Sequence, residues 1–383
     1  MSTIELDSIC RYRTESVPVD SLPYVTTESM LPNKAGIAAK ASEPISGKAR
    51  LFQKGDTLVS NIRPYFKKIW QADCDGCCSA DVLVFEPSNC DADYLYLLLS
   101  NDVFFSYMVS TVKGTKMPRG DKSAIMHYTL EYMNADEQRA IAGVLNPIRE
   151  LIATNQRAND YLAEYLKSYA KRLYREYERD EGADLPEGWH WTNIDEISEM
   201  VCRSITPKYN DESDELILGQ TCIRNNLVLL ENGRLHAPKK ITEKWLKKHD
   251  LLVNSTGVGS LGRTAQVWFD PSKLVVDSHV TIVRAADPRH ALYMGFWAFE
   301  HERYIESLHT GSTGQTELPR DHVQAIRLVL PSDVELEKLN AVAQPVVELI
   351  VANQEESKRL AELRDTLLPK LMSGEIDVSS VAI

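Results

Sequence analysis

Two long segments of the chain repeat apolar residues with the rhythm of paired helices. In residues 134–178 and 332–374, positions suited to a buried seam recur in alternating steps of four and three, which is a heptad pattern. The first seam consists of Ile141, Leu145, Ile148, Ile152, Asn155, Asn159, Leu162, Leu166, Tyr169 and Leu173. The second consists of Leu339, Ala343, Val346, Ile350, Asn353, Ser357, Leu360, Arg364, Leu367 and Leu371. The pattern predicts two long helices that could bury their seams against each other.

Both seams carry polar residues at their midpoints. The polar layer predicted from them consists of Asn155, Asn159, Asn353 and Ser357. Such a layer fixes the register of two helices at some cost in stability. The alternative is that each helix packs on its own globular domain. Pro147 and Pro345 lie early in the two segments, so we expect a kink or a new helix start at each.

The other segments mix short strand-like runs with amphipathic helices. Runs rich in β-branched residues lie at 57–60, 82–85, 251–253 and 280–283, and helical patterns lie near 92–109 and 289–308. Glycine, proline and asparagine-rich turns separate them. This mixture predicts an α+β fold.

The chain also matches itself. Residues 147–156 correspond to 345–354, 55–60 to 249–254, and 114–119 to 315–320. A period this long indicates two domain-sized units rather than a solenoid. We therefore expect two similar globular domains related by internal duplication and separated by the two helices. The predicted boundaries are 1–133 for the first domain, 134–180 for the central helix, 181–331 for the second domain, and 332–383 for the final helix and tail.

Composition and charge narrow the function classes. The chain has 383 residues, seven cysteines and a net charge of −12, and its first residues lack the basic and apolar regions of a secretory signal. These features favour a cytoplasmic globular protein without a membrane span. Negative charge argues against nucleic acid, but residues 34–68 and 234–263 form two basic clusters at corresponding places in the two domains.

Motifs that would indicate catalysis fail on context. Gly257–Gly262 superficially match a dinucleotide-binding loop, but residues 264–271 alternate like a strand where a helix is required. Cys74, Cys77 and Cys78 could supply zinc ligands, yet a second pair at suitable spacing is missing, so free thiols are preferred. We expect a non-enzyme without catalytic residues, metal or cofactor.

The side chains around the basic clusters instead suit nucleic-acid recognition. Arginine pairs with guanine, asparagine and glutamine with adenine, and lysine, serine and threonine with phosphates. The candidates in the first domain are Ser60, Asn61, Arg63, Tyr65, Lys67, Lys68, Thr115, Lys116 and Arg119. Those in the second are Asn254, Ser255, Thr256, Ser260, Arg263, Ser312, Thr313, Gln315 and Arg320.

Four motifs resemble those of a known family, the DNA-specificity subunit of type I restriction–modification systems. They are Gly114–Asp121, Leu185–Trp191, Gly311–Arg320 and Leu368–Ile376, and the resemblance covers essentially the whole chain.

The resemblance implies a non-catalytic subunit with two target-recognition domains, each of which reads half of a bipartite site in double-stranded DNA. It implies that the two long helices join these domains as an antiparallel coiled coil. It also implies two methyltransferase (modification) subunits and a restriction/translocase subunit as partners, with S-adenosylmethionine and ATP bound by those partners. The competing hypothesis is a coiled-coil scaffold for proteins without direct DNA readout, which the net charge favours and the paired basic clusters oppose.

Overall fold

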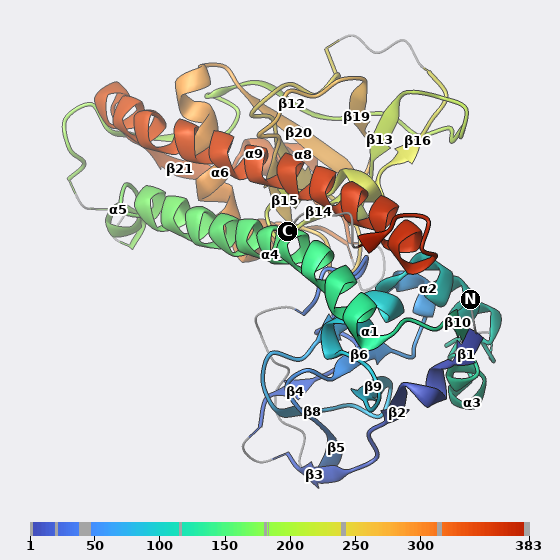
Figure 1. The fold of residues 1–383 in the computed structure, drawn as a ribbon. Coiled ribbons are helices and arrows are strands. Elements are labelled where there is room, and N and C mark those ends of the chain that lie inside the picture. The colour runs from blue at the N-terminus through green and yellow to red at the C-terminus, as the bar shows by residue number, and fades with distance from the viewer. Residues whose placement is uncertain are drawn as a thin grey trace. The chain divides into compact units, whose positions relative to one another are not determined.

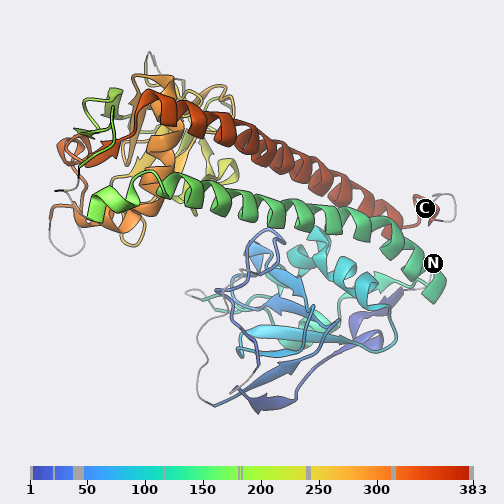
Figure 2. The same ribbon diagram turned by 90° about the vertical axis from the view of Figure 1, so that its left-hand side faces the viewer.

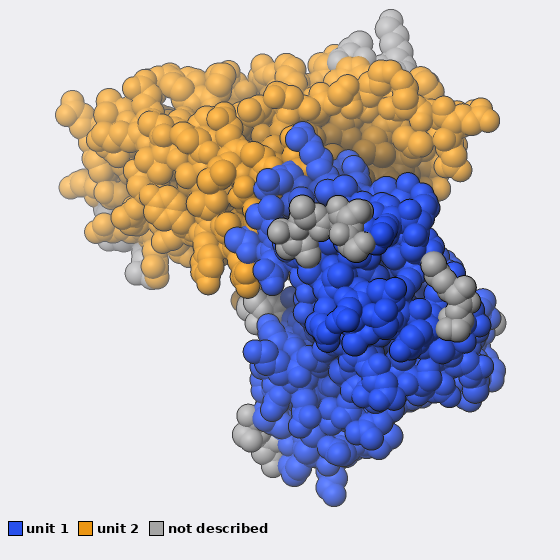
Figure 3. All heavy atoms as spheres, viewed as in Figure 1, with its two compact units in different colours: residues 1–154, 356–383 blue, residues 155–355 orange. Residues whose placement is uncertain are grey.

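The structure, a computed structural model, describes residues 3–19, 22–37, 47–114, 117–179, 182, 184–238, 243–311 and 316–378. The chain forms two compact units, which are coloured separately in Figure 3. Unit 1 comprises residues 1–154 and 356–383, and unit 2 comprises residues 155–355. Each unit mixes sheets and helices (Figure 1).

Unit 1 is built on two four-stranded sheets. The first has the order β2 (Cys10–Tyr12), β9 (Val82–Pro87), β6 (Thr57–Ser60) and β7 (Ile69–Gln71), and all its pairs are antiparallel. The second has the order β3 (Ser16–Pro18), β5 (Lys48–Phe52), β8 (Gly76–Cys78) and β4 (Tyr24–Val25), with a parallel pair between β4 and β8. A short pair joins β1 (Thr3–Glu5) to β10 (Thr129–Glu131).

Unit 2 repeats the first of these sheets with different residues. The order β12 (Ser198–Arg203), β20 (Val280–Ala285), β17 (Leu251–Asn254) and β18 (Thr264–Gln266) is again antiparallel throughout. A short pair again joins the first and last strands of the domain, β11 (His190–Asn193) and β21 (Arg327–Leu330). The other sheets are β16 (Arg234–Leu235), β13 (Leu216–Leu218) and β19 (Leu274–Val276), and the pair β14 (Ile223–Arg224) and β15 (Leu227–Val228).

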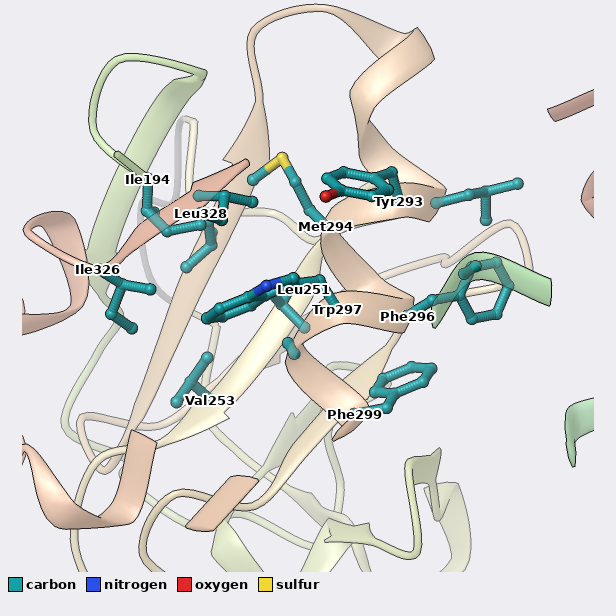
Figure 4. Packing of buried hydrophobic residues seen from close by; sticks show 14 of the residues in the cluster. Ile194, Leu251, Val253, Tyr293, Met294, Phe296, Trp297, Phe299, Ile326 and Leu328 are labelled. Carbon is teal, nitrogen blue, oxygen red and sulfur yellow. The ribbon is translucent and has the colours of Figure 1, made fainter. Parts of the chain in front are cut away.

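Helices complete the core of each unit. Unit 1 has α1 (Ala92–Ser100), α2 (Asp102–Ser110) and α3 (Lys122–Met126), and unit 2 has α5 (Arg175–Arg179), α6 (Pro288–Glu300), α7 (Glu302–Ser307) and α8 (Arg320–Gln324). In unit 2, Trp297 and Phe296 of α6 belong to one buried cluster with Leu251 and Val253 of β17 (Figure 4). The helices expected near 92–109 and 289–308 are each two helices. Asn101 explains the first break, because its side chain caps α2 by accepting the Val103 N–H at 2.9 Å.

The two long helices are α4 (Ala135–Lys171) and α9 (Asp333–Met372), which Figure 2 draws in green and red. Each contributes residues to both units. In unit 1, Ile141 and Leu145 of α4 share a buried cluster with Leu368 and Leu371 of α9. Each helix continues through its internal proline, so the new helix start that was one of the two expected outcomes at Pro147 and Pro345 does not occur.

In unit 2, the same helices meet through amides. The Asn353 side chain donates a hydrogen bond to Oδ1 of Asn159 at 2.8 Å, and the Asn159 side chain donates to the Ile350 carbonyl at 3.2 Å. Asn155 and Asn159 are buried, and Ser357 is partly buried. Two of the four predicted polar-layer residues therefore bond directly to each other.

Within the part of the chain that the structure describes, no helix has both the length and the apolar character needed to cross a bilayer.

Candidate nucleic-acid interface

In unit 1, a tight turn presents two aromatic rings to solvent. The single helical turn Pro64–Phe66 is flanked by Arg63 and Lys67, whose φ angles of 49° and 50° are left-handed. This conformation is costly for residues with a Cβ and is found mainly where surrounding structure enforces it. It leaves Tyr65 51% exposed, with its ring centroid 4.8 Å from that of Phe66. The turn thus offers a surface on which bases or sugars could stack.

A second loop holds this turn in place. The Arg63 N–H donates to the Pro118 carbonyl at 2.9 Å, and Ile62 pairs with Arg119 in an isolated antiparallel bridge. The Arg119 guanidinium bonds both oxygens of Asp81, at 2.9 and 3.2 Å. Residues 61–68, 113–114 and 117–121 therefore form one surface, which we call the unit 1 loop pair.

Acidic side chains already partner Lys67, Lys113 and Arg119 of the unit 1 loop pair. The Lys67 ammonium lies 3.0 Å from Asp102, and Lys113 pairs with Asp121. Burial opposes ionisation of Asp102, but hydrogen bonds from Lys34 and Lys67 hold the pKa of that carboxyl below its usual value. A phosphate at this surface would have to displace these carboxylates.

Unit 2 carries a glycine-rich loop at the matching place, directly after β17. Gly257, Gly259 and Gly262 have φ angles of 101°, 73° and 78°. A Cβ on Gly262 would lie 2.6 Å from the Glu306 backbone nitrogen, so only glycine allows this close approach. Val258, at the tip, is 86% exposed. The loop therefore projects from the unit while its base is tightly packed.

A second segment also supports this loop. Thr256 pairs with Glu317 in an antiparallel bridge, and the Leu318 N–H donates to the Ser255 carbonyl at 2.8 Å. We call residues 254–263, 310–311 and 316–320 the unit 2 loop pair. The bridges show that the two loop pairs are built alike, because each joins the loop after the third strand of its sheet to the segment before a short helix.

A glutamine that the sequence analysis did not select organises the unit 2 loop pair. The Gln220 amide nitrogen donates to Thr256 Oγ1 at 2.6 Å, and its Oε1 accepts from Ser260 Oγ at 3.2 Å. Thr256 Oγ1 also lies 2.8 Å from His279 Nδ1. Gln220 lies more than thirty residues before the loop, and its neighbours form no motif, so no local pattern could have indicated its role.

Comparison with known proteins identifies similar chains. No family model matches the chain. Among curated proteins, it is 22% identical over 309 residues to the Type I restriction enzyme MjaIX specificity subunit of Methanocaldococcus jannaschii, covering 76% of this chain and 70% of that protein. It is 24% identical over 260 residues to the Type I restriction enzyme HindI specificity subunit of Haemophilus influenzae, covering 65% of this chain but only 55% of that protein.

Its curated relatives are type I restriction enzyme specificity subunits. A solved structure agrees at the level of the fold. The crystal structure of a type I restriction–modification system S subunit from M. genitalium has a TM-score of 0.50 and 16% identity, covering 97% of this chain and 96% of that one.

The candidate contact residues differ in how far their side chains are exposed to solvent. Arg63, Tyr65, Arg119 and Arg320 are exposed. Partly buried residues are Lys67, Lys68, Thr256, Ser260 and Arg263. The side chains of Ser60, Asn61, Asn254 and Ser255 are buried, so in this conformation they shape the loops from below rather than face a ligand. Thr115, Lys116, Ser312, Thr313 and Gln315 lie outside the described residues.

One correspondence inferred from sequence is shifted. Matching the Pro-Arg pairs aligned Arg119 with Arg320, but in the structure Arg119 and Glu317 take the same place in the two bridges. The helices that follow agree, because α3 begins at Lys122 and α8 at Arg320. Unit 2 therefore has an acid where unit 1 has a guanidinium, and its Arg203 approaches Glu317 at 2.5 Å.

The cysteine cluster lies in β8 and the turn before it. Cys77 and Cys78 are adjacent buried residues of one strand and belong to different hydrophobic clusters, as expected for side chains on opposite faces. Burial raises the pKa of Cys77 and raises that of Cys78 to about 12, which disfavours the thiolates that zinc requires. The two side chains therefore point to opposite faces of β8 rather than toward one point.

Proposed function

We propose that this chain is the non-catalytic, sequence-specific DNA-binding subunit of a type I restriction–modification complex. The observation that carries the proposal is the pair of similarly built loop surfaces, one in each unit, in a chain whose curated relatives are specificity subunits. Each loop pair reads one half of a bipartite target in double-stranded DNA. Different side chains at matching places give the two halves different sequences.

We further infer that the chain arose by internal duplication and that α4 and α9 pair as an antiparallel coiled coil. The matching strand orders of the two main sheets support the duplication. The bond between Asn159 and Asn353 and the cluster that joins Leu145 to Leu368 support the pairing. In this view residues 1–133 and 181–331 are the recognition domains, and residues 134–180 and 332–383 are the spacer helices.

Exposed or partly exposed arginines are the best candidates for base readout, because a guanidinium can bond both acceptors of a guanine edge. Arg63 and Arg119 would act in one half-site, and Arg263 and Arg320 in the other. Lys67 and Lys68 suit phosphate contacts, which position a protein without specifying sequence. Ser312, Thr313, Gln315, Thr115 and Lys116 remain candidates for either role.

The proposed partners are two methyltransferase subunits and a restriction/translocase subunit. The methyltransferase subunits would dock on the spacer helices and domains, and S-adenosylmethionine and ATP would bind to the partners. The helix lengths of 37 and 40 residues correspond to about 55–60 Å at ~1.5 Å per residue. We infer that helix length sets the unread spacer between half-sites, so adding one heptad to both helices should lengthen the spacer without changing the bases read.

DNA titration of the chain assembled with its methyltransferase subunits tests the proposal. Lys67→Ala should weaken binding to all sequences and reduce its dependence on salt, since a phosphate contact is lost. Arg63→Ala should instead weaken discrimination at one base pair by about 5- to 150-fold. Equal affinity of the wild-type complex for target and scrambled duplexes would refute the proposed function.

A coiled-coil scaffold that binds proteins without reading DNA is the second candidate. The net charge of −12 and the carboxylates already bound to Lys67 and Arg119 favour it. This alternative predicts that Arg63→Ala and Lys67→Ala leave DNA binding by the complex unchanged, while helix substitutions abolish assembly.

A further inference from the structure

A polar cavity in unit 2 adjoins the loop pair. Its volume is about 210 Å³, several times the ~30 Å³ that a water molecule occupies in the liquid. Gln220 lines the cavity and also bonds Thr256 and Ser260 of the loop that follows β17. The cavity therefore shares a wall with the surface proposed to meet DNA.

A buried carboxylate lies in this cavity with one oxygen unused. Asp277, directly after β19, is 7% exposed. Its Oδ1 accepts the His279 N–H at 2.8 Å, whereas among the described residues no donor bonds its Oδ2. Burial raises the pKa of this carboxyl, as expected for a carboxylate held away from water. Such a group gains from a ligand that brings an N–H donor.

A glycine keeps the space around that oxygen open. A Cβ on Gly219 would lie 2.9 Å from Asp277 Oδ2, closer than van der Waals contact allows. The same place in unit 1 is built differently. Asp277 N–H donates to the Leu218 carbonyl and Ser79 N–H donates to the Val25 carbonyl, both at 2.9 Å, so Ser79 takes the place of Asp277 and Thr26 that of Gly219. At these two positions unit 1 thus has a hydroxyl in place of the carboxylate and a side chain in place of the glycine.

Another part of the cavity lining is aromatic and positively charged. The Arg234 guanidinium carbon lies 3.4 Å from the centroid of the Tyr209 ring, and both residues line the cavity together with Asn232. Stacked guanidinium and aromatic planes accept the face of a nucleobase, and a carboxylate accepts from an exocyclic amino group. Stacking and amine recognition are therefore available in one site.

We propose that this cavity holds one amino-bearing nucleobase, adenine or cytosine, from the half-site read by unit 2, with Asp277 Oδ2 accepting its amino group. The inference rests on the proposed function and makes Asp277 a specificity-determining residue of unit 2 alone. It would be reached by a base turned out of the duplex, because Asp277 is only 7% exposed and lines a cavity.

The test removes the amino group and the carboxylate separately and together. Methylome sequencing of cells that carry the chain and its partner genes first defines the bipartite target. In duplexes of that target, each adenine or cytosine of the unit 2 half is then replaced in turn by purine or pyrimidin-2-one, which lack the amino group. Affinities are measured for the assembled complex with the wild-type chain, Asp277→Asn and Asp270→Asn. Asp270 is exposed in the same unit, so its variant controls for the loss of charge.

At one position, loss of the amino group should weaken binding of the wild-type and Asp270→Asn complexes by about 5- to 150-fold and leave that of Asp277→Asn nearly unchanged. Asp277→Asn should fold, because asparagine retains an oxygen for the His279 N–H. Gly219→Ala, which crowds Oδ2, should reproduce the effect at the same position.

Other outcomes distinguish failure of the cavity proposal from failure of the proposed function. If the wild-type complex prefers its target but every amino deletion affects Asp277→Asn as much as wild type, the cavity proposal is wrong and the proposed function stands. Binding of free adenosine or cytidine that depends on Asp277, with no such coupling in the duplex, would also overturn it. If no target preference exists at all, the proposed function itself fails.

Discussion

In each unit a buried carboxylate is neutralised by a guanidinium group, but the guanidinium comes from a different strand in the two units. Asp56 in unit 1 and Asp250 in unit 2 each stand just before the third strand of the main sheet, and each carboxylate accepts the N–H of the residue three positions earlier at 2.8 Å. Across the sheet, Glu86 occupies in unit 1 the position that Arg284 occupies in unit 2. The acid is common to both units, but its cation is not.

In unit 1 the cation comes from the outer strand. Arg13, just beyond β2, reaches Asp56 at 2.7 Å and Glu86 at 3.0 Å, so that it neutralises two acids. In unit 2, Arg284 bonds both oxygens of Asp250 at 2.7 Å and donates to the Glu243 and Trp245 carbonyls. The scaffold requires a neutralised carboxylate at this corner, and the strand that supplies the guanidinium can vary.

Removing either acid should have the largest effect. Asp250→Asn leaves the buried Arg284 guanidinium without its main charge partner, which costs about 3–5 kcal/mol. Asp56→Asn should cost less than this, because Arg13 keeps its ion pair with Glu86 at 3.0 Å. Hydrogen exchange measured by mass spectrometry should show the loss in the amides of β17 for Asp250→Asn and of β6 for Asp56→Asn. Asp270→Asn is the exposed control and should leave both strands as protected as in wild type. A loss of protection below ~1 kcal/mol would show that the stability of these strands does not depend on the charge of the carboxylate.

A second prediction concerns unit 1 variants in which the guanidinium is moved from the outer strand to position 86, as in unit 2. Arg13→Cys copies the residue at the equivalent position of unit 2, Cys202, and should cost unit 1 about 3–5 kcal/mol, because the buried Asp56 loses its cation while Glu86 keeps Arg11. Adding Glu86→Arg and Arg11→Met completes the unit 2 arrangement and should recover most of that loss. Urea denaturation of the single and triple variants checks this. A triple variant no more stable than Arg13→Cys would contradict the equivalence of the two corners.

The residue before each acid gives a smaller contrast. Gly55 and His249 both have left-handed backbones, with φ of 94° and 69°. Gly55→Ala should destabilise unit 1 by about 1–2 kcal/mol, since its Cβ finds room beside Ala92 but its backbone does not suit alanine. His249→Gly should stabilise unit 2 by a similar or smaller amount. Thermal unfolding of both variants measures the effect, and shifts of the same sign would count against the assignment.

Local patterns predicted much of this scaffold, and pairings between distant segments account for the remainder. The apolar runs at 57–60 and 251–253 are confirmed as strands because alternation and β-branching are local properties. The cavity around Asp277 could not be anticipated, since parallel pairing of β13 with β19 joins residues nearly sixty positions apart. Arg119 was matched to the wrong partner because residue types were aligned where loop lengths differ.

The buried candidates show a further limit of sequence reasoning. Asn61 and Asn254 have the chemistry of adenine readers, but burial depends on what the rest of the unit places over them. Asn254 instead donates to the Gln220 carbonyl at 3.1 Å and so helps to hold the residue that organises the unit 2 loop pair. Residue type alone did not separate contact from support.

Methylome sequencing of three strains tests the central claim most directly. The strains carry the partner genes with the wild-type chain, with Arg63→Ala, or with Arg263→Ala. The account predicts that the wild-type chain directs methylation to a bipartite target. Arg63→Ala should change the methylated sequence in one half of this target only, and Arg263→Ala should change it in the other half only. A single continuous target, or variants that both alter the same half, would contradict it.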